Sequence, residues 1–186
     1  MLNELRVSSG SLTRRQSIGG VVMAIGGLAL GSTRAFAAPD DGTTHTAEAI
    51  HQEPVLAASP KRVYEALMDA AQFQKVQLLS GAMKASDLIA KPAEISRDAG
   101  GAINLFGGYI FGRQIELVPN KRIVQAWRVG NWPAGVYSIA KFELAAEGTG
   151  TKIVFDHAGF PKGTAEHLAI GWKAHYWDGL AHYFAS

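Results

Sequence analysis

The feature that most constrains the fold is a series of short, strand-like segments that ends in one long amphipathic helix. Between residues 94 and 157, segments of alternating apolar residues are separated by turn-forming sequences such as Pro119-Asn120-Lys121. From Thr164 to Phe184, apolar side chains recur at helical spacing instead. An antiparallel sheet followed by a single long helix buries its apolar face by curving around that helix.

The segment before this sheet predicts an edge strand and two helices. Residues 47–57 alternate as a strand, but Pro54 has no N–H to donate, so the strand lies at a sheet edge or bulges there. Ser59 is a good N-cap and Pro60 fits the first helical position, and a second short helix follows over residues 71–79.

The sequence therefore predicts an α+β fold of one domain over residues 47–186. We expect a curved antiparallel sheet of about six to seven strands, wrapped around the long C-terminal helix. Two short helices follow the first strand, and the sequence contains no internal repeat.

The first 37 residues have the pattern of a twin-arginine export signal. Arg14 and Arg15 precede an uncharged run of 18 residues, and Ala35-Phe36-Ala37 forms a small-x-small cleavage site. Five glycines make this run less apolar than a spanning helix, although its length leaves a retained anchor as the alternative. We expect a periplasmic or secreted protein in which residues 38–46 form a flexible leader before the domain.

Cleavage of that signal changes the charge of the chain. It removes four arginines and one glutamate, which leaves 14 basic and 15 acidic residues. A nucleic-acid partner, which requires a basic face, is therefore not expected. The chain has no cysteine, so the domain is held together without disulfides.

Several stretches of the predicted domain resemble one known family. They are Gly112–Arg128, Trp132–Gly135, Gly171-Trp172 and Tyr176-Trp177. Together they are similar to the C-terminal domain of the activator of heat-shock-protein-90 ATPase and its bacterial relatives, which belong to the START-like (SRPBCC) superfamily. The resemblance covers residues 47–186 and implies a helix-grip fold, which in this superfamily often encloses a ligand cavity. Because one fold supports many functions, it does not by itself assign one.

The aromatic residues of the sheet and last helix form the candidate ligand site. Strand alternation places small and aromatic side chains on the face toward the helix, where the small ones leave room for an apolar or amphipathic ligand. The alternative is that all of them interdigitate as a packed core. The candidate residues are Trp127, Ser138, Ala140, Phe142, Phe155, His157, Trp172, His175 and Tyr176.

The sequence offers little for catalysis and no metal site or cofactor. His175 and His182 are seven residues apart, about 10 Å along a helix, which is too far to share one ion. Asp156 and His157 are adjacent on a strand, so they point to opposite faces and do not form a dyad. An enzyme that uses His157 or His175 as the acid–base group in the pocket remains the second hypothesis.

A protein-binding module is the third hypothesis, because the co-chaperone relatives engage a chaperone. The turn Asn120-Lys121-Arg122 and the loop Trp132-Pro133 are the candidate contact segments. That chaperone is cytosolic, whereas the N-terminal pattern predicts export. The favoured expectation is therefore an exported ligand-binding domain rather than an enzyme, and its oligomeric state is left open.

Overall fold

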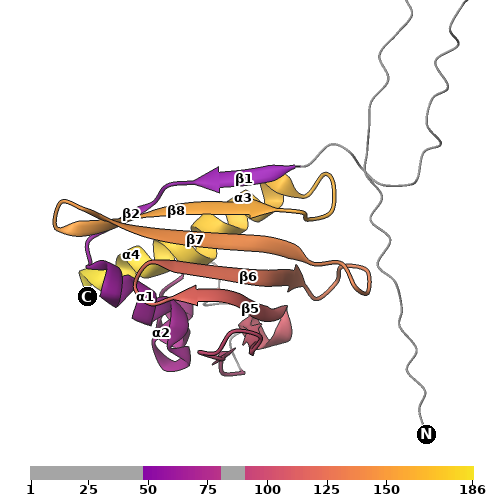
Figure 1. Cartoon of the computed structure of the whole chain (residues 1–186), viewed down its shortest axis with the longest axis horizontal. Coiled ribbons are helices and arrows are strands. Elements are labelled where there is room, and N and C mark those ends of the chain that lie inside the picture. The colour runs from indigo at the N-terminus through magenta and orange to yellow at the C-terminus, as the bar shows by residue number, and fades with distance from the viewer. Residues whose placement is uncertain (1–47, 81–90) are drawn as a thin grey trace, which may run out of the picture. The chain divides into compact units, whose positions relative to one another are not determined.

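The computed structural model describes residues 48–80 and 91–186 (Figure 1). The predicted signal, cleavage site and leader lie outside the described residues. The strands are β1 (Ala49–Gln52), β2 (Val55–Leu56), β3 (Glu94–Ile95), β4 (Ala102–Leu105), β5 (Ile110–Val118), β6 (Arg122–Val129), β7 (Ser138–Glu147) and β8 (Gly150–Ala158). The helical elements are α1 (Pro60–Met68), α2 (Ala70–Leu79), the 3-10 turn η2 (Phe106–Gly108), α3 (Ala165–Trp172), the π-helical turn η3 (Lys173–Trp177) and α4 (Asp178–Ala185).

The strands form one antiparallel sheet in the order β1-β8-β7-β6-β5-β4-β3, with β2 paired to β8. The predicted α+β helix-grip architecture is confirmed, and β1 lies at an edge as expected. The described sheet has eight strands because Pro54 divides the first expected strand into β1 and β2. The Pro54 carbonyl oxygen still accepts a hydrogen bond from the N–H of Ile153, so both parts remain beside β8.

The two helices after β2 begin where the capping residues place them. The Ser59 side chain accepts from the N–H of Arg62 at the start of α1, and the Asp69 carboxylate accepts from the N–H of Gln72 at the start of α2. Within residues 48–80 and 91–186, no helix has the length and apolarity needed to cross a membrane.

The C-terminal helix is interrupted by one π-helical turn, which the sequence pattern did not predict. The N–H of Asp178 donates to the carbonyl oxygen of Lys173, five residues earlier. This bond brings residues five apart onto one face, so Trp172 and Trp177 are both buried with their ring planes only 21° apart. The expected apolar face is otherwise correct, with Leu168, Trp172, Tyr176 and Leu180 buried and Tyr183 partly buried.

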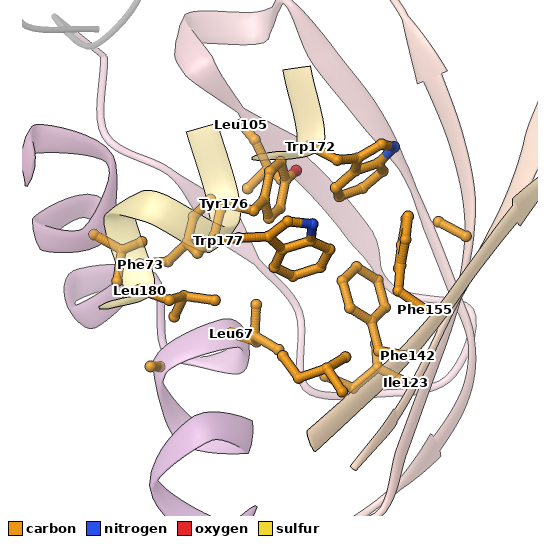
Figure 2. Close-up of a cluster of buried hydrophobic side chains, with 14 of the residues drawn as sticks. Leu67, Phe73, Leu105, Ile123, Phe142, Phe155, Trp172, Tyr176, Trp177 and Leu180 are labelled. Atoms are coloured by element: carbon orange, nitrogen blue, oxygen red, sulfur yellow. The ribbon is translucent and has the colours of Figure 1, made fainter. Parts of the chain in front are cut away.

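The core lies between this helix and the concave face of the sheet (Figure 2). Side chains alternate along β6, β7 and β8 as predicted, with one set buried and the other more exposed. Phe142 and Phe155 from the sheet meet Trp172 and Trp177 from the helix, and the Phe155 and Trp172 ring centroids are 4.4 Å apart.

Candidate functional site

A cavity of about 460 Å³ lies between the C-terminal helix and one end of the sheet, and it is partly open to solvent. The wall on the sheet side comes from η2 and from the neighbouring ends of β5 and β6, and the other wall from α3 and η3. It is lined by Phe106, Tyr109, Ile110, Trp127, Val129, His167, Leu168, Ile170, Gly171, Trp172, Ala174, His175 and Tyr176.

A left-handed turn in η2 shapes one side of this cavity. Phe106, Gly107 and Gly108 all have positive φ angles, of 51°, 65° and 94°. Glycine adopts this conformation readily, but for Phe106 it costs about 1–2 kcal/mol. The turn places the Phe106 ring edge-on to the rings of Tyr176 and His175, with centroids 5.8 and 5.9 Å away. Backbone strain is therefore located at the cavity wall, as is common at functional sites.

The mouth of the cavity is apolar and carries two imidazoles. Ile170 is 62% exposed and Tyr109 40% exposed, although both are large apolar side chains. His175 is half-buried, with Nδ1 3.4 Å from the Ser80 hydroxyl oxygen. Burial, together with the neighbouring His167, lowers the pKa of His175 below its usual range. His175 is therefore neutral at neutral pH.

Two polar atoms at the inner wall have no hydrogen-bond partner. Tyr176 and Trp127 are only 5% and 3% exposed, and the Tyr176 hydroxyl and the Trp127 indole N–H are both unpaired. Burial raises the pKa of the Tyr176 phenol, and the nearby Trp127 N–H opposes this shift only in part. The phenol thus keeps its proton at neutral pH and is available as a donor.

By contrast, His157 lies behind the cavity in a hydrogen-bond chain in which every partner is satisfied. The Trp172 indole N–H donates to Nδ1 of His157 over 2.9 Å, so that nitrogen carries no proton. The proton is therefore on Nε2, which is 2.7 Å from the Ser138 hydroxyl oxygen. Ser138 in turn donates to the Trp127 carbonyl oxygen over 2.9 Å. The chain runs from helix to sheet and fixes one neutral form of the imidazole.

The sequence matches the family described as "Activator of Hsp90 ATPase homolog 1-like protein" over residues 57–185, which is most of the described domain. The chain belongs to this family. The resemblance inferred from the sequence motifs is confirmed at this level.

Relatives of this Aha1-like chain support the same assignment. The human activator of 90 kDa heat shock protein ATPase homolog 1 is 29% identical over 93 residues, and the homologue from Dictyostelium discoideum is 34% identical over 89 residues. These stretches cover 50% and 47% of this chain but only 28% and 23% of the relatives, so the chain spans about a quarter of their length.

Solved structures show the same fold. An HSP90 activator from Plasmodium falciparum superposes with a TM-score of 0.59 at 22% identity, covering 69% of this chain and 89% of the other. A protein from Chromobacterium violaceum gives a TM-score of 0.57 at 26% identity, with coverages of 74% and 97%.

In this Aha1-like domain the predicted site residues fall into two groups. Trp127, Trp172, His175 and Tyr176 line the cavity. The other five lie in the packed core beyond it: Ser138, Ala140, Phe142, Phe155 and His157. Ser138 and Ala140 are only 1% and 0% exposed, and Ser138 is hydrogen-bonded to His157, whose ring lies 5.4 Å from that of Trp172. We therefore do not include these five residues in the proposed ligand site.

The residues that sequence reasoning missed come from two places. Phe106 and Tyr109 flank the Gly107-Gly108 pair, outside the strands whose alternation identifies inward-facing residues, and Ile170 lies in the segment predicted as a regular helix. The Phe106-Gly107-Gly108 sequence was the available signal, because consecutive glycines permit a sharp turn that brings both aromatic residues to one side.

The geometry limits what chemistry the domain can perform. Desolvation lowers the pKa of His157 to about 3, and both of its ring nitrogens are engaged, so it cannot serve as an acid–base group at neutral pH. Asp156 points to the other face, as predicted, and pairs with His51 and Lys141. Among the residues that the structure describes, no group of three or more potential ligands could hold a metal ion.

Proposed function

We propose that this protein binds a small apolar or amphipathic molecule in the cavity between the sheet and the C-terminal helix. The observation that carries the proposal is the cavity itself. Its volume of about 460 Å³ lies within the usual range for small-molecule sites, and its lining is mainly aromatic and aliphatic. Apolar side chains such as Ile170, which remain exposed at the mouth, gain about 25 cal/mol for each Å² that a ligand covers.

Filling the cavity from its own wall tests this function. Gly171 lines the cavity, and a Cβ added there would come no closer than 3.9 Å to any neighbouring atom, the Cδ2 of His175. Gly171→Leu should therefore fold normally while occupying ligand space. The matched control is Ala181→Leu, which places the same side chain at an exposed position on α4 outside this cavity.

The measurement is the fluorescence of phenylnaphthylamine, an uncharged apolar fluorophore, titrated with the purified protein. We expect saturable binding to the wild type and to Ala181→Leu, and a loss of about tenfold or more in Gly171→Leu, which corresponds to about 1.4 kcal/mol. Equal binding to the wild type and Gly171→Leu would refute the proposed function, as would the absence of saturable binding to the wild type.

We also propose that the protein is exported through the twin-arginine pathway. The support is the paired arginine before an uncharged run and a small-x-small site. In fractionation of cells that express the full chain, the mature protein should lie outside the cytoplasm and begin at Ala38. A double substitution, Arg14→Lys with Arg15→Lys, should retain it in the cytoplasm. A cytoplasmic wild-type protein with an intact N-terminus would overturn this proposal.

Family membership supports a second candidate, a protein-binding module that acts on an Hsp90-type ATPase as the relatives' names state. The outer face of the sheet offers a surface for it. Tyr137 and Ile139 are each 45% exposed, and the Arg128 guanidinium lies 5.4 Å from the centre of the Tyr137 ring. Stimulation of an Hsp90 ATPase by the wild type, reduced in Tyr137→Ser, would favour this candidate. Unchanged ATPase rates would exclude it.

A further inference from the structure

The unpaired polar atoms at the inner wall of the cavity indicate what its occupant must carry. In the described part of the chain, the buried side-chain atoms without a partner are the Trp127 indole N–H, the Tyr176 hydroxyl and both amide atoms of Gln77. Trp127 and Tyr176 both line the cavity, whereas Gln77 does not. A buried polar group that lacks a partner is costly, and native structures usually satisfy it with protein, water or a ligand.

Both unpaired groups at this wall are hydrogen-bond donors. An indole nitrogen can only donate, and a phenol that keeps its proton also donates through its hydroxyl. The Trp127 N–H lies near the Tyr176 oxygen without completing a hydrogen bond, and the hydroxyl hydrogen has no acceptor. Figure 2 shows the Tyr176 oxygen directed away from Phe73 and Leu180. The missing partner is therefore an acceptor.

The rest of the lining disfavours a charged acceptor. Over residues 48–80 and 91–186, no Asp, Glu, Lys or Arg side chain lines the cavity. A carboxylate at the inner wall would be buried without a counter-ion, which costs far more than burying a carbonyl or ether oxygen. His175, which also lines the cavity, is uncharged at neutral pH and so provides no counter-ion there.

We infer that the cavity takes an uncharged, largely apolar molecule bearing one acceptor oxygen, such as a ketone, which receives hydrogen bonds from Tyr176 and Trp127. The inference rests on the proposed function and specifies its ligand class. Neither donor atom touches solvent in this conformation, so binding requires the Tyr176 and Trp127 side chains to turn toward the cavity.

Two naphthalenes of the same size test the inference by calorimetric titration. Acetylnaphthalene carries a ketone oxygen, and ethylnaphthalene carries hydrogens in its place. The measured quantity is the ratio of their affinities, ketone over hydrocarbon, in the wild type and in Tyr176→Phe. Because Tyr176→Phe removes the hydroxyl and keeps the ring, we expect this ratio to fall about tenfold. The infrared carbonyl stretch of bound acetylnaphthalene should lie at lower frequency in the wild type than in the variant.

Each result separates the inference from the proposed function. If both naphthalenes bind but their affinity ratio is the same in the two proteins, the acceptor inference is wrong and the apolar cavity stands. If neither they nor phenylnaphthylamine bind, the proposed function fails. Tighter binding of naphthoate than of acetylnaphthalene would also overturn the inference, because it would show that the wall accepts a charge. Should Tyr176→Phe fail to fold, Trp127→Phe removes the other donor, and the same ratio of ketone to hydrocarbon affinity is measured in that variant.

Discussion

Two buried polar clusters lie one helical turn apart on the same helix, and they differ in one respect. At Trp172 the indole N–H, the imidazole of His157 and the hydroxyl of Ser138 form a chain in which every hydrogen has an acceptor. At Tyr176 the hydroxyl and the facing indole of Trp127 have no partner. The first cluster is complete without any other molecule, and the second is not.

The difference separates a structural role from the proposed binding role. A satisfied buried network stabilises one arrangement of helix and sheet, because breaking any bond leaves a desolvated group behind. An unsatisfied pair beside a cavity weakens the free protein and is retained where an occupant supplies the missing bond. The chemistry of histidine would by itself suggest His157 as the functional residue. The hydrogen bonds that each group makes or lacks suggest Tyr176 instead.

The largest expected effect is on the pH dependence of stability through His157. Its pKa is about 3 in the folded protein against 6.5 when unfolded, so the unfolded state binds more protons between these values. The contribution of His157 to stability should therefore be constant well above pH 6.5 and fall as pH decreases, by roughly 2–3 kcal/mol at pH 4.5 and roughly 4 kcal/mol at pH 3. Urea denaturation at a series of pH values across this range measures the free energy of unfolding.

His157→Gln is the sharpest control, because a Gln side chain can accept from Trp172 and donate to Ser138 without titrating. Its stability should vary much less than that of the wild type between pH 6.5 and 4.5. Below that range Glu65, Glu143 and Asp156, whose pKa values are lowered by their ion pairs, also contribute. An equal slope in the two proteins above pH 4.5 would show that His157 is not the source.

The next largest expected effect on stability comes from removing the Ser138 hydroxyl. Ser138→Ala leaves the Nε2–H of His157 without its acceptor and takes a donor from the Trp127 carbonyl, both in the core. We expect a loss of about 2–3 kcal/mol in the free energy of unfolding. A loss under about 0.5 kcal/mol, the range of an ordinary surface substitution, would mean that the chain is not a structural network.

Removing the Tyr176 hydroxyl should change the free energy of unfolding in the opposite direction. In the ligand-free protein Tyr176→Phe deletes a desolvated group that has no partner, so the free energy of unfolding should rise by about 1 kcal/mol. The same denaturation experiment as for Ser138→Ala measures it, which makes the two variants a matched pair of hydroxyl deletions. Destabilisation by Tyr176→Phe comparable with that of Ser138→Ala would erase the contrast between the clusters.

Sequence patterns predicted most of the fold because its elements depend on local rules. The alternation of side chains along β6, β7 and β8 predicted which of them face inward. Ser59 and Pro60 predicted where α1 begins. The missed features depend on single backbone bonds. A regular helical period cannot reveal the Lys173–Asp178 bond that brings Trp177 into the core beside Trp172.

The candidate site was only half predictable for the same reason. Alternation identifies which side chains face the helix, but it does not say which of them the helix covers. Trp172 packs against His157, the hydrogen-bond partner of Ser138, and the cavity lies further along, where Phe106 adopts a left-handed conformation. Whether a buried hydroxyl has a partner depends on distances between distant segments, and no pattern of residue types contains that information.

The smallest expected effect on stability concerns the mouth of the cavity. Ile170 is 62% exposed on α3, so Ile170→Ser should change the free energy of unfolding by no more than about 0.5 kcal/mol. Affinity for phenylnaphthylamine should still fall a few-fold, because the ligand loses apolar surface to cover. Leu78, which is 48% exposed on α2 and does not line this cavity, provides the control in Leu78→Ser. If both variants bind the fluorophore equally well, the exposed apolar side chain at the mouth takes no part in binding, and the binding role is confined to the inner wall at Tyr176 and Trp127.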